Sequence, residues 1–386
     1  MSELSDGTDV LLIGGGVASV RCARTLRREG FSGRILLVGD ETTAPYNRPP
    51  LSKELLREDL PDDLVLAEPE RWYERRGIEL LRGRRVIGLD LDEKEATLED
   101  DARIRFDRCL LATGAEPRAL PVPGGDEVIL LRTLEDARRL RAAAMAAGPG
   151  APVAVIGGSF IGIEVASSLR ALGLQPTIVE MADRLWSGRL GSELAAWAAD
   201  SLTGAGIGVR LRAGVGCIAE GSAWLGGEQL PAAFVVAGVG VRPRDQLATA
   251  AGLHVDDGIV VDAEQRTSHP SAWAAGDVAR HGPMRIEHWH AAREAGERAA
   301  RSMLGLPVAP PPEPWFFSEV AGTSLDVVGM ASAWDEERWM AKGLLAYLEE
   351  GAVVQLASIG SAMYAARMRE IVAARPPAEI VAWGGD

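Results

Sequence analysis

The sequence predicts an α/β protein with two Rossmann-like domains and a small α+β domain at its C-terminal end. The first observation behind this prediction is a strand, glycine turn, helix, strand and acid pattern near the start of the chain. The second is a repeat of that pattern about 140 residues later. The third is the stiff segment Pro311-Pro312-Glu313-Pro314, after which the pattern changes. A chain of 386 residues has room for two or three such domains.

The first glycine turn follows the apolar run Val10–Ile13, which predicts a buried strand, and leads into a helical pattern over residues 17–28. Gly14 permits a tight turn, and Gly16 lets a pyrophosphate approach the backbone beside the amide donors of the helix N-terminus. The next predicted strand is followed by Asp40, which is placed to accept hydrogen bonds from an adenosine ribose. This segment therefore predicts a dinucleotide site.

The second glycine turn follows the predicted strand Pro152–Ile156 and has Ser159 where the first turn has its middle glycine. An acid again ends the next strand, and the residues expected to contact a dinucleotide are Gly157, Ile161, Gly162 and Glu180. The Glu180 carboxylate would bind a free ribose 2′-hydroxyl and repel a 2′-phosphate, so NADH is preferred to NADPH. Only Arg184, nearby, argues for the phosphate.

Three later apolar segments end in small or acidic residues: Cys109–Gly114, Phe234–Gly240 and Ala272–Asp277. Each alone is more often plain sheet core, but their order fits crossovers between two nucleotide-binding domains. The cofactor contacts expected at their ends are Thr113, Gly114, Gly238 and Asp277, the last suited to a ribityl chain. Two dinucleotide sites in one chain suggest that FAD and NAD lie face to face for hydride transfer.

Composition narrows the possible partners. The formal net charge of -14 argues against nucleic acid and an anionic membrane as the main partner. Cys22, Cys109 and Cys217 are isolated, so no disulfide framework, zinc site or dithiol centre is expected. No metal site is expected at His288 and His290 either. The polar N-terminus and the lack of an 18-residue apolar run predict a cytoplasmic protein.

Lysine is rare in this chain and occurs only at Lys53, Lys94 and Lys342. Lys53 lies in the segment Ala-Pro-Tyr-Asn-Arg-Pro-Pro-Leu-Ser-Lys-Glu-Leu-Leu, residues 44–56. The paired prolines stiffen the approach, and Ser52 is predicted to cap a helix that starts at Lys53. This segment resembles the signature of the FAD-dependent NADH:ferredoxin reductases, which include the putidaredoxin, rubredoxin and dioxygenase ferredoxin reductases.

The resemblance covers nearly the whole chain and implies a glutathione-reductase-like architecture. It implies an FAD domain at residues 1–118 and 248–312, an NAD domain at 119–247 and a C-terminal domain at 313–386. It also implies that Lys53 lies beside the flavin N5 edge and pairs with Glu164 from the NAD-site helix. The other flavin-site positions carried over from the family are Arg48, Val86, Arg132, Asp277 and Trp289.

The function implied is transfer of electrons from NADH through FAD to a ferredoxin, a small iron–sulfur protein that serves a Rieske dioxygenase or a cytochrome P450. The protein would be a monomer or weak homodimer. A locally basic stretch is a candidate docking surface, with Arg71, Arg75, Arg76, Arg82, Arg84 and Arg85 set against Glu74 and Glu79. The proline-rich motif has no cysteine, which separates the chain from the coenzyme A disulfide reductases and NADH peroxidases.

Two alternatives remain open. Phe317 stands where the family usually has tryptophan near the flavin, which suggests an NADH oxidase or diaphorase that uses oxygen or a quinone. A signalling role like that of apoptosis-inducing factor would need a basic nucleic-acid surface, which the net charge disfavours.

Overall fold

The structure is a computed structural model that describes residues 7–219 and 221–383. The chain divides into two compact units. The first unit contains the described part of residues 1–47 together with residues 61–116 and 242–311. The second contains residues 48–60 and 117–241 and the described part of residues 312–386. The chain passes between the units at residues 47/48, 60/61, 116/117, 241/242 and 311/312. The crossings at 116/117 and 241/242 fall in β7 (Ala115–Pro117) and β16 (Val241–Pro243).

The first unit is built on a sheet whose strands run in the order β3-β2-β1-β6-β5-β4, with β18 paired to β6. Strands β3, β2, β1, β6 and β18 are mutually parallel, whereas β4, β5 and the start of β6 form an antiparallel extension. These strands are β1 (Thr8–Ile13), β2 (Ile35–Gly39), β3 (Ile78–Arg82), β4 (Val86–Asp90), β5 (Glu95–Leu98), β6 (Arg103–Leu111) and β18 (Ala272–Ala274).

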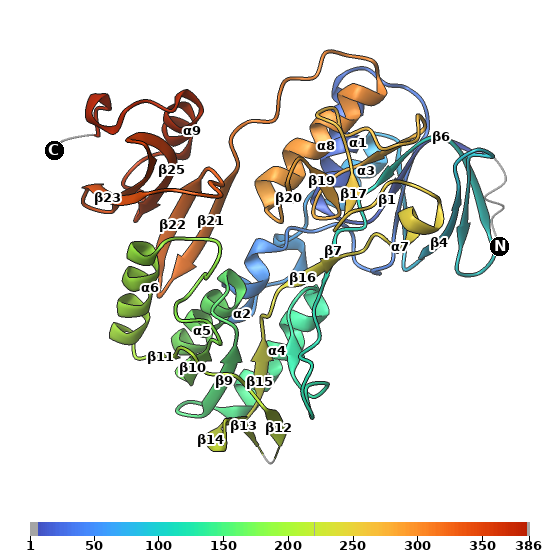
Figure 1. The fold of residues 1–386 in the computed structure, drawn as a ribbon. Coiled ribbons are helices and arrows are strands. Elements are labelled where there is room, and N and C mark those ends of the chain that lie inside the picture. The colour runs from blue at the N-terminus through green and yellow to red at the C-terminus, as the bar shows by residue number, and fades with distance from the viewer. Residues whose placement is uncertain (1–6, 220, 384–386) are drawn as a thin grey trace. The chain divides into compact units, whose positions relative to one another are not determined.

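Helices cover this sheet, and α1 packs along α8 (Figure 1). The helices of the first unit are α1 (Val17–Arg28), the 3-10 helix η2 (Asp62–Leu64), α3 (Glu70–Arg75), α7 (Gln246–Ala250) and α8 (Trp289–Met303). A small sheet adds β17 (Ile259–Val260), β19 (Ala279–His281) and β20 (Met284–Arg285). The apolar runs read from the sequence form the core, since Val10, Leu11 and Leu12 are fully buried.

The second unit contains a parallel sheet in the order β11-β10-β9-β15-β8. Its strands are β8 (Ile129–Leu130), β9 (Pro152–Ile156), β10 (Gln175–Val179), β11 (Gly208–Arg210) and β15 (Val235–Ala237). An antiparallel meander adds β12 (Cys217–Ala219), β13 (Ser222–Leu225) and β14 (Glu228–Pro231). The helices are the 3-10 helix η1 (Pro49–Ser52), α2 (Glu54–Arg57), α4 (Leu134–Ala147), α5 (Phe160–Ala171) and α6 (Ser192–Gly204).

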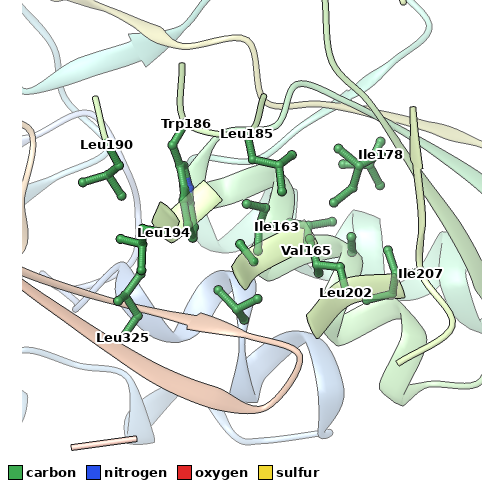
Figure 2. Packing of buried hydrophobic residues seen from close by; sticks show 14 of the residues in the cluster. Ile163, Val165, Ile178, Leu185, Trp186, Leu190, Leu194, Leu202, Ile207 and Leu325 are labelled. Carbon is green, nitrogen blue, oxygen red and sulfur yellow. The ribbon is translucent and has the colours of Figure 1, made fainter. Parts of the chain in front are cut away.

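The C-terminal part of the second unit is an antiparallel sheet in the order β21-β22-β25-β24-β23. Its elements are β21 (Trp315–Val320), β22 (Thr323–Val328), β23 (Glu336–Ala341), β24 (Leu344–Glu349), β25 (Ala352–Ile359), α9 (Ala365–Ala374) and the 3-10 helix η3 (Ala378–Ile380). The prediction of a small sheet closed by a helix is confirmed for this segment. Its inner face shares one apolar core with α5 and α6, and Leu325 of β22 and Leu194 of α6 both belong to this core (Figure 2).

The N-terminus of α6 is capped by the C-terminal sheet. Gly191, the residue before the helix, has no side chain that could cap it. Instead the carboxylate of Glu337 on β23 accepts hydrogen bonds from the amides of Ser192 and Glu193, at 2.8 and 3.0 Å. The Tyr347 hydroxyl accepts a third from the amide of Gly191. Four amides at a helix start lack partners within the helix, and this cap supplies a negative charge where the helix dipole favours one.

One local prediction was wrong. Ser52 does not cap a helix that starts at Lys53, because Ser52 closes the 3-10 helix η1 and Lys53 itself precedes α2, with φ −122° and ψ −106°. The two prolines favour the tight 3-10 turn at that place, which draws the Ser52 hydroxyl away from the capping position. Among the described residues, no helix is long and apolar enough to span a membrane.

Candidate functional site

In the first unit the predicted cofactor residues gather at the carboxyl ends of neighbouring parallel strands. The strands lie side by side in the order β2, β1, β6, β18. The residues that follow them are Asp40 after β2, Gly14 and Gly16 after β1, Thr113 and Gly114 after β6, and Asp277 after β18. Because these strands are neighbours, residues that are spread over 264 positions of the sequence (14 to 277, counted inclusively) come to lie along one edge of the sheet. In open α/β sheets this edge is where ligands bind.

The first glycine turn fits a dinucleotide phosphate. Gly14 has φ +115°, and a Cβ there would stand 2.2 Å from the carbonyl oxygen of Ala112. Gly16 is the N-cap residue of α1 and has no side chain that could cap the helix. The first turn of α1 has no acidic residue. The start of α1 therefore presents amides and a positive dipole end without a side chain that competes for them, which suits the pyrophosphate of FAD.

Asp40 is held by two arginines that the sequence did not single out for this role. Its Oδ2 accepts a hydrogen bond of 2.7 Å from Arg244, and Arg85 lies 3.5 Å from the same oxygen. Burial disfavours the charged carboxylate, but the hydrogen bond and charge of Arg244, with the charge of Arg85, hold the pKa of Asp40 below its usual value. Arg244 is fixed in turn by Thr113 and Gly114, whose hydroxyl and carbonyl bond its backbone at 2.6 and 2.9 Å.

The remaining predicted positions of the first unit are also ordered. Val86 begins β4 and is buried. Trp289 begins α8, and its indole Nε1 donates a 3.0 Å hydrogen bond to Asn47. Arg285 is buried and donates to the carbonyl of Asp277, which fixes the backbone at the end of β18.

The second unit repeats the arrangement. Its strands lie in the order β10, β9, β15, β8, and the residues that follow them are Glu180, Gly157, Gly238 and Arg132. Gly157 has φ +105°, and a Cβ there would stand 2.5 Å from the carbonyl oxygen of Gly238. Arg48 donates a 3.2 Å hydrogen bond to the carbonyl of Arg132. This strand-end edge therefore collects Gly157, Gly238 and Glu180, which were predicted to contact a dinucleotide, and also Arg132, which was predicted as a flavin-site residue together with Arg48.

The second turn differs in its hydrogen bonds. The Ser159 hydroxyl caps α5 by accepting a 3.2 Å hydrogen bond from the amide of Gly162. The Glu180 carboxylate accepts 2.7 Å hydrogen bonds from the amides of Gly158 and Ala182. Ile161, in the first turn of α5, is 41% exposed and offers an apolar surface beside the turn. These residues fit NAD, with the acid fixed at the position that discriminates the ribose 2′ substituent.

A buried ion pair joins the proline-rich segment to α5. Lys53 Nζ lies 2.7 Å from Glu164 Oε2, and both side chains are less than a tenth exposed. The same oxygen accepts a 2.5 Å hydrogen bond from the Ser52 hydroxyl, and Oε1 accepts one of 2.7 Å from Ser318 on β21. The ammonium also lies 5.7 Å from the ring centroid of Phe317, which is 37% exposed. Sequence reasoning named Lys53 and Glu164 through the resemblance but did not predict the hydrogen bonds from Ser52 and Ser318 to Glu164.

A second pair lies beside the first. Arg57 donates two hydrogen bonds to Glu319, at 2.8 and 3.1 Å, in the bidentate geometry that is strong for guanidinium and carboxylate. Arg57 is one helical turn after Lys53, and Glu319 follows Ser318 on β21. The Arg57–Glu319 pair therefore joins residues 48–60 to β21, whereas the Lys53–Glu164 pair joins them to α5. No local sequence signal could have shown a pair separated by 262 positions.

Two other kinds of chemistry find no support in the described residues. No group of three or more His, Cys, Asp or Glu side chains there could hold a metal ion. The three cysteines all lie in the described part of the chain as free thiols, with Cys22 and Cys109 buried. Burial raises the pKa of both buried thiols well above the usual range, which keeps them unreactive.

Two strand-end dinucleotide sites, with a C-terminal antiparallel sheet, define the class of two-nucleotide flavoprotein oxidoreductases. The family model for pyridine nucleotide-disulphide oxidoreductases matches residues 8–296. The chain is 36% identical over 335 residues to the biphenyl dioxygenase system ferredoxin–NAD(+) reductase component of Paraburkholderia xenovorans, covering 83% of this chain and 81% of that protein. It is 33% identical over 399 residues to the putidaredoxin reductase of Pseudomonas putida, covering 96% and 93%.

A comparison with solved structures supports the same family. A covalent complex of putidaredoxin reductase with putidaredoxin matches with a TM-score of 0.91 at 30% identity, covering 96% of this chain and 94% of that one. The chain therefore belongs to the pyridine nucleotide-disulphide oxidoreductase family, among its ferredoxin–NAD(+) reductases, which are flavoprotein oxidoreductases. The predicted fold class and family are confirmed. The assignment of individual residues to FAD and NAD, and the three-domain boundaries, stay predictions.

Proposed function

We propose that the protein takes electrons from NADH and delivers them to a ferredoxin that serves a Rieske dioxygenase or a cytochrome P450. The proposal is supported by the similarity over most of the chain to a ferredoxin–NAD(+) reductase component of a biphenyl dioxygenase system, at 36% identity, and to a putidaredoxin reductase, at 33%. The observation that carries the proposal for this chain is the buried pair of Lys53 and Glu164. In the family that the chain resembles, this pair lies at the reactive edge of the flavin.

The nucleotides divide between the two units in this proposal. The strand-end edge with Gly14, Gly16 and Asp40 binds FAD, and the one with Gly157, Gly162 and Glu180 binds NADH. FAD, when bound, accepts two electrons from NADH and releases them one at a time. The protein positions the two nucleotides and provides the electrostatic field, with no need for a proton-transferring triad.

Lys53 supplies the field. A lysine ammonium is a compact positive charge, and beside a flavin it stabilises negative charge that develops on reduction. Glu164 fixes the ammonium at 2.7 Å. Because both side chains are buried in the second unit, water screens their charges little.

The direct test is an electron-transfer assay on the purified, FAD-loaded protein with NADH and a panel of [2Fe–2S] ferredoxins. At least one ferredoxin should be reduced much faster than oxygen consumes NADH. Rates no better than the oxygen background with every ferredoxin would contradict the proposal. NADPH in place of NADH should give slower flavin reduction, because Glu180 repels a 2′-phosphate.

The salt dependence of the same assay would describe the docking surface. The stretch 71–85 predicted a basic patch, but in the first unit Arg82, Arg84 and Arg85 are already paired with Glu70, Asp100 and Asp40. This internal pairing favours a mainly apolar contact with the ferredoxin. Rates that change little with added salt would support this, whereas a steep fall would indicate electrostatic docking.

A second candidate, NADH oxidation by oxygen or a quinone, is favoured by one residue. Phe317 replaces the tryptophan usual in the family and is 37% exposed. A Phe317→Trp variant should consume oxygen more slowly with NADH if this ring controls access to the flavin. Equal oxygen consumption by both proteins would remove this reason for the alternative.

A further inference from the structure

One face of α5 carries polar residues through the interior of the second unit. Ser167 and Ser168 lie three and four positions after Glu164, which places both on the side of the helix that carries Glu164. All three are buried. Buried polar side chains are costly unless they are hydrogen-bonded, so this polar stripe needs partners from elsewhere in the fold.

Ser167 donates a 2.7 Å hydrogen bond to the carbonyl of Ile163 within α5, and the other partners come from two segments distant in sequence. Ser168 donates a 2.6 Å hydrogen bond to the carbonyl of Ser52, and Ser167 accepts one of 3.0 Å from the amide of Ala321. Glu164 binds both segments, through Ser52 on one carboxylate oxygen and Ser318 on the other. The polar stripe therefore binds both the proline-rich segment and the end of β21 to the same helix, α5.

Ser318 has a special place in this alignment. Its side chain is 3% exposed and is directed toward Glu164, whereas its neighbour Phe317 is 37% exposed, as the alternation of a strand requires. Glu164 Oε2 already has two donors, Ser52 and Lys53. Oε1 has Ser318 as its donor among the hydrogen bonds of the described residues. Loss of that hydroxyl would leave a buried carboxylate oxygen without its partner.

We propose that Ser318 is a positioning residue for electron transfer, through which the C-terminal sheet fixes the Glu164 carboxylate and hence the Lys53 ammonium. The inference rests on the proposed role of Lys53 at the flavin. Ser52 acts in the same way from the other side of the carboxylate. With only one side of Glu164 held, the carboxylate can rotate and the ammonium can follow it, and displacements of about 1 Å at such a site cost large factors in rate.

The test compares Ser318→Ala, Ser318→Thr and a matched control, Ser358→Ala. Ser358 is also a fully buried serine of the C-terminal sheet, but its hydroxyl accepts from the amide of Met363 and does not touch Glu164. Two quantities are measured on the FAD-loaded proteins: the rate constant of flavin reduction by NADH, and the midpoint potential of the bound flavin.

Ser318→Ala should lower the rate constant about tenfold, as loss of one hydrogen bond to a charged group would. It should also make the flavin potential more negative, because the ammonium is held less firmly. Ser318→Thr, which keeps the hydroxyl, should restore both quantities, and Ser358→Ala should leave both as in the unmodified protein. In a Glu164→Gln background, Ser318→Ala should have little further effect, since the serine acts through that carboxylate.

An unchanged rate constant and potential in Ser318→Ala would overturn the proposal, as would equal changes in Ser358→Ala. If Ser318→Ala fails to fold with FAD, Ser52→Ala decides by the same criteria. These readouts need NADH and flavin only. A failure to reduce any ferredoxin would therefore count against the proposed function and leave the test of Ser318 valid.

Discussion

The two glycine turns of this protein have the same strand, turn and helix arrangement but differ at the N-cap residue of the helix. Each turn follows a buried parallel strand and leads into a 12-residue helix. In the first turn the N-cap residue is Gly16, which makes no side-chain hydrogen bond. In the second it is Ser159, whose hydroxyl already accepts the amide of Gly162. One helix start is left for a ligand, whereas the other is partly satisfied by the protein itself.

In the proposed assignment, FAD binds at the first turn and NADH at the second, and the difference between the turns suits the different residence times of these cofactors. A helix start without a competing side chain gains the full benefit of phosphate binding, as a permanently bound FAD requires. A helix whose N-terminal amide is capped by the protein loses less free energy when the nucleotide leaves. This suits a nucleotide that must bind and dissociate in each turnover. The acids differ too, since Asp40 is engaged by arginines and Glu180 by backbone amides.

The largest effect is expected from Gly14→Ala in the first turn. Its Cβ would stand 2.2 Å from a carbonyl oxygen, at φ +115°, so the backbone must move. We expect a loss of about 2–5 kcal/mol in unfolding free energy from strain and overpacking, with little FAD retained. Urea unfolding and the flavin content per chain measure this. Gly15→Ala is the control, because its Cβ would meet nothing closer than 4.0 Å, and equal losses in both variants would contradict the explanation.

A smaller effect is expected from Glu180→Gln in the second turn. The amide oxygen can still accept a hydrogen bond from a backbone amide, but the negative charge that repels a 2′-phosphate is gone. The ratio of kcat/KM for NADH to that for NADPH should fall about tenfold, or about 1.4 kcal/mol. Glu228→Gln, an exposed glutamate of the same unit paired with Arg210, should leave the ratio unchanged. A ratio unaffected by Glu180→Gln would show that this acid does not select the coenzyme.

The ion pair at the first acid predicts a pH-dependent effect. The pKa of Asp40 is lower in the folded protein than in the unfolded chain, because Arg244 and Arg85 outweigh the effect of burial. The pair therefore stabilises the fold above the usual aspartate pKa of about 4, and this stability is lost as the pH falls through the lower folded value. Arg244→Ala should cost about 1 kcal/mol at neutral pH.

Urea unfolding at several pH values would check this prediction. The difference between Arg244→Ala and the unmodified protein should shrink toward zero in acid. Arg242→Ala, which removes a more exposed pair with Glu116, should have little effect at any pH. A constant difference at all pH values would mean that Arg244 stabilises the fold by packing rather than through Asp40.

The smallest effect is expected from exchanging the N-cap residues. Ser159→Gly frees the amide of Gly162 for a phosphate and costs the helix only a few tenths of a kcal/mol. The dissociation constant for NADH should fall about threefold, a fraction of what one charged hydrogen bond contributes. The reciprocal variant, Gly16→Ser, should weaken FAD binding. Titration calorimetry with NADH and FAD would detect both, and changes of the opposite sign would refute the comparison.

The sequence predicted the local elements well and the long-range contacts poorly. The helix expected over residues 17–28 is α1 with the same bounds, because strand, turn and helix signals all lie within twenty residues. The partners of Glu164 illustrate the opposite case: Ser52 and Ser318 are separated from it by 112 and 154 positions. Arg244 was missed at Asp40 for the same reason. Such residues come together only through the tertiary fold, and no periodic pattern in the sequence indicates which of them will be in contact.

The cap on α6 has consequences for the folding of the second unit and for replacing its C-terminal sheet with that of another protein. The amides at the start of α6 donate hydrogen bonds to Glu337 and Tyr347, which are synthesised more than 140 residues later. A growing chain cannot complete this helix start until the C-terminal sheet has formed, so the two should fold as one cooperative element. A chimera that borrows another reductase's C-terminal sheet would need to bring its own carboxylate to that helix end.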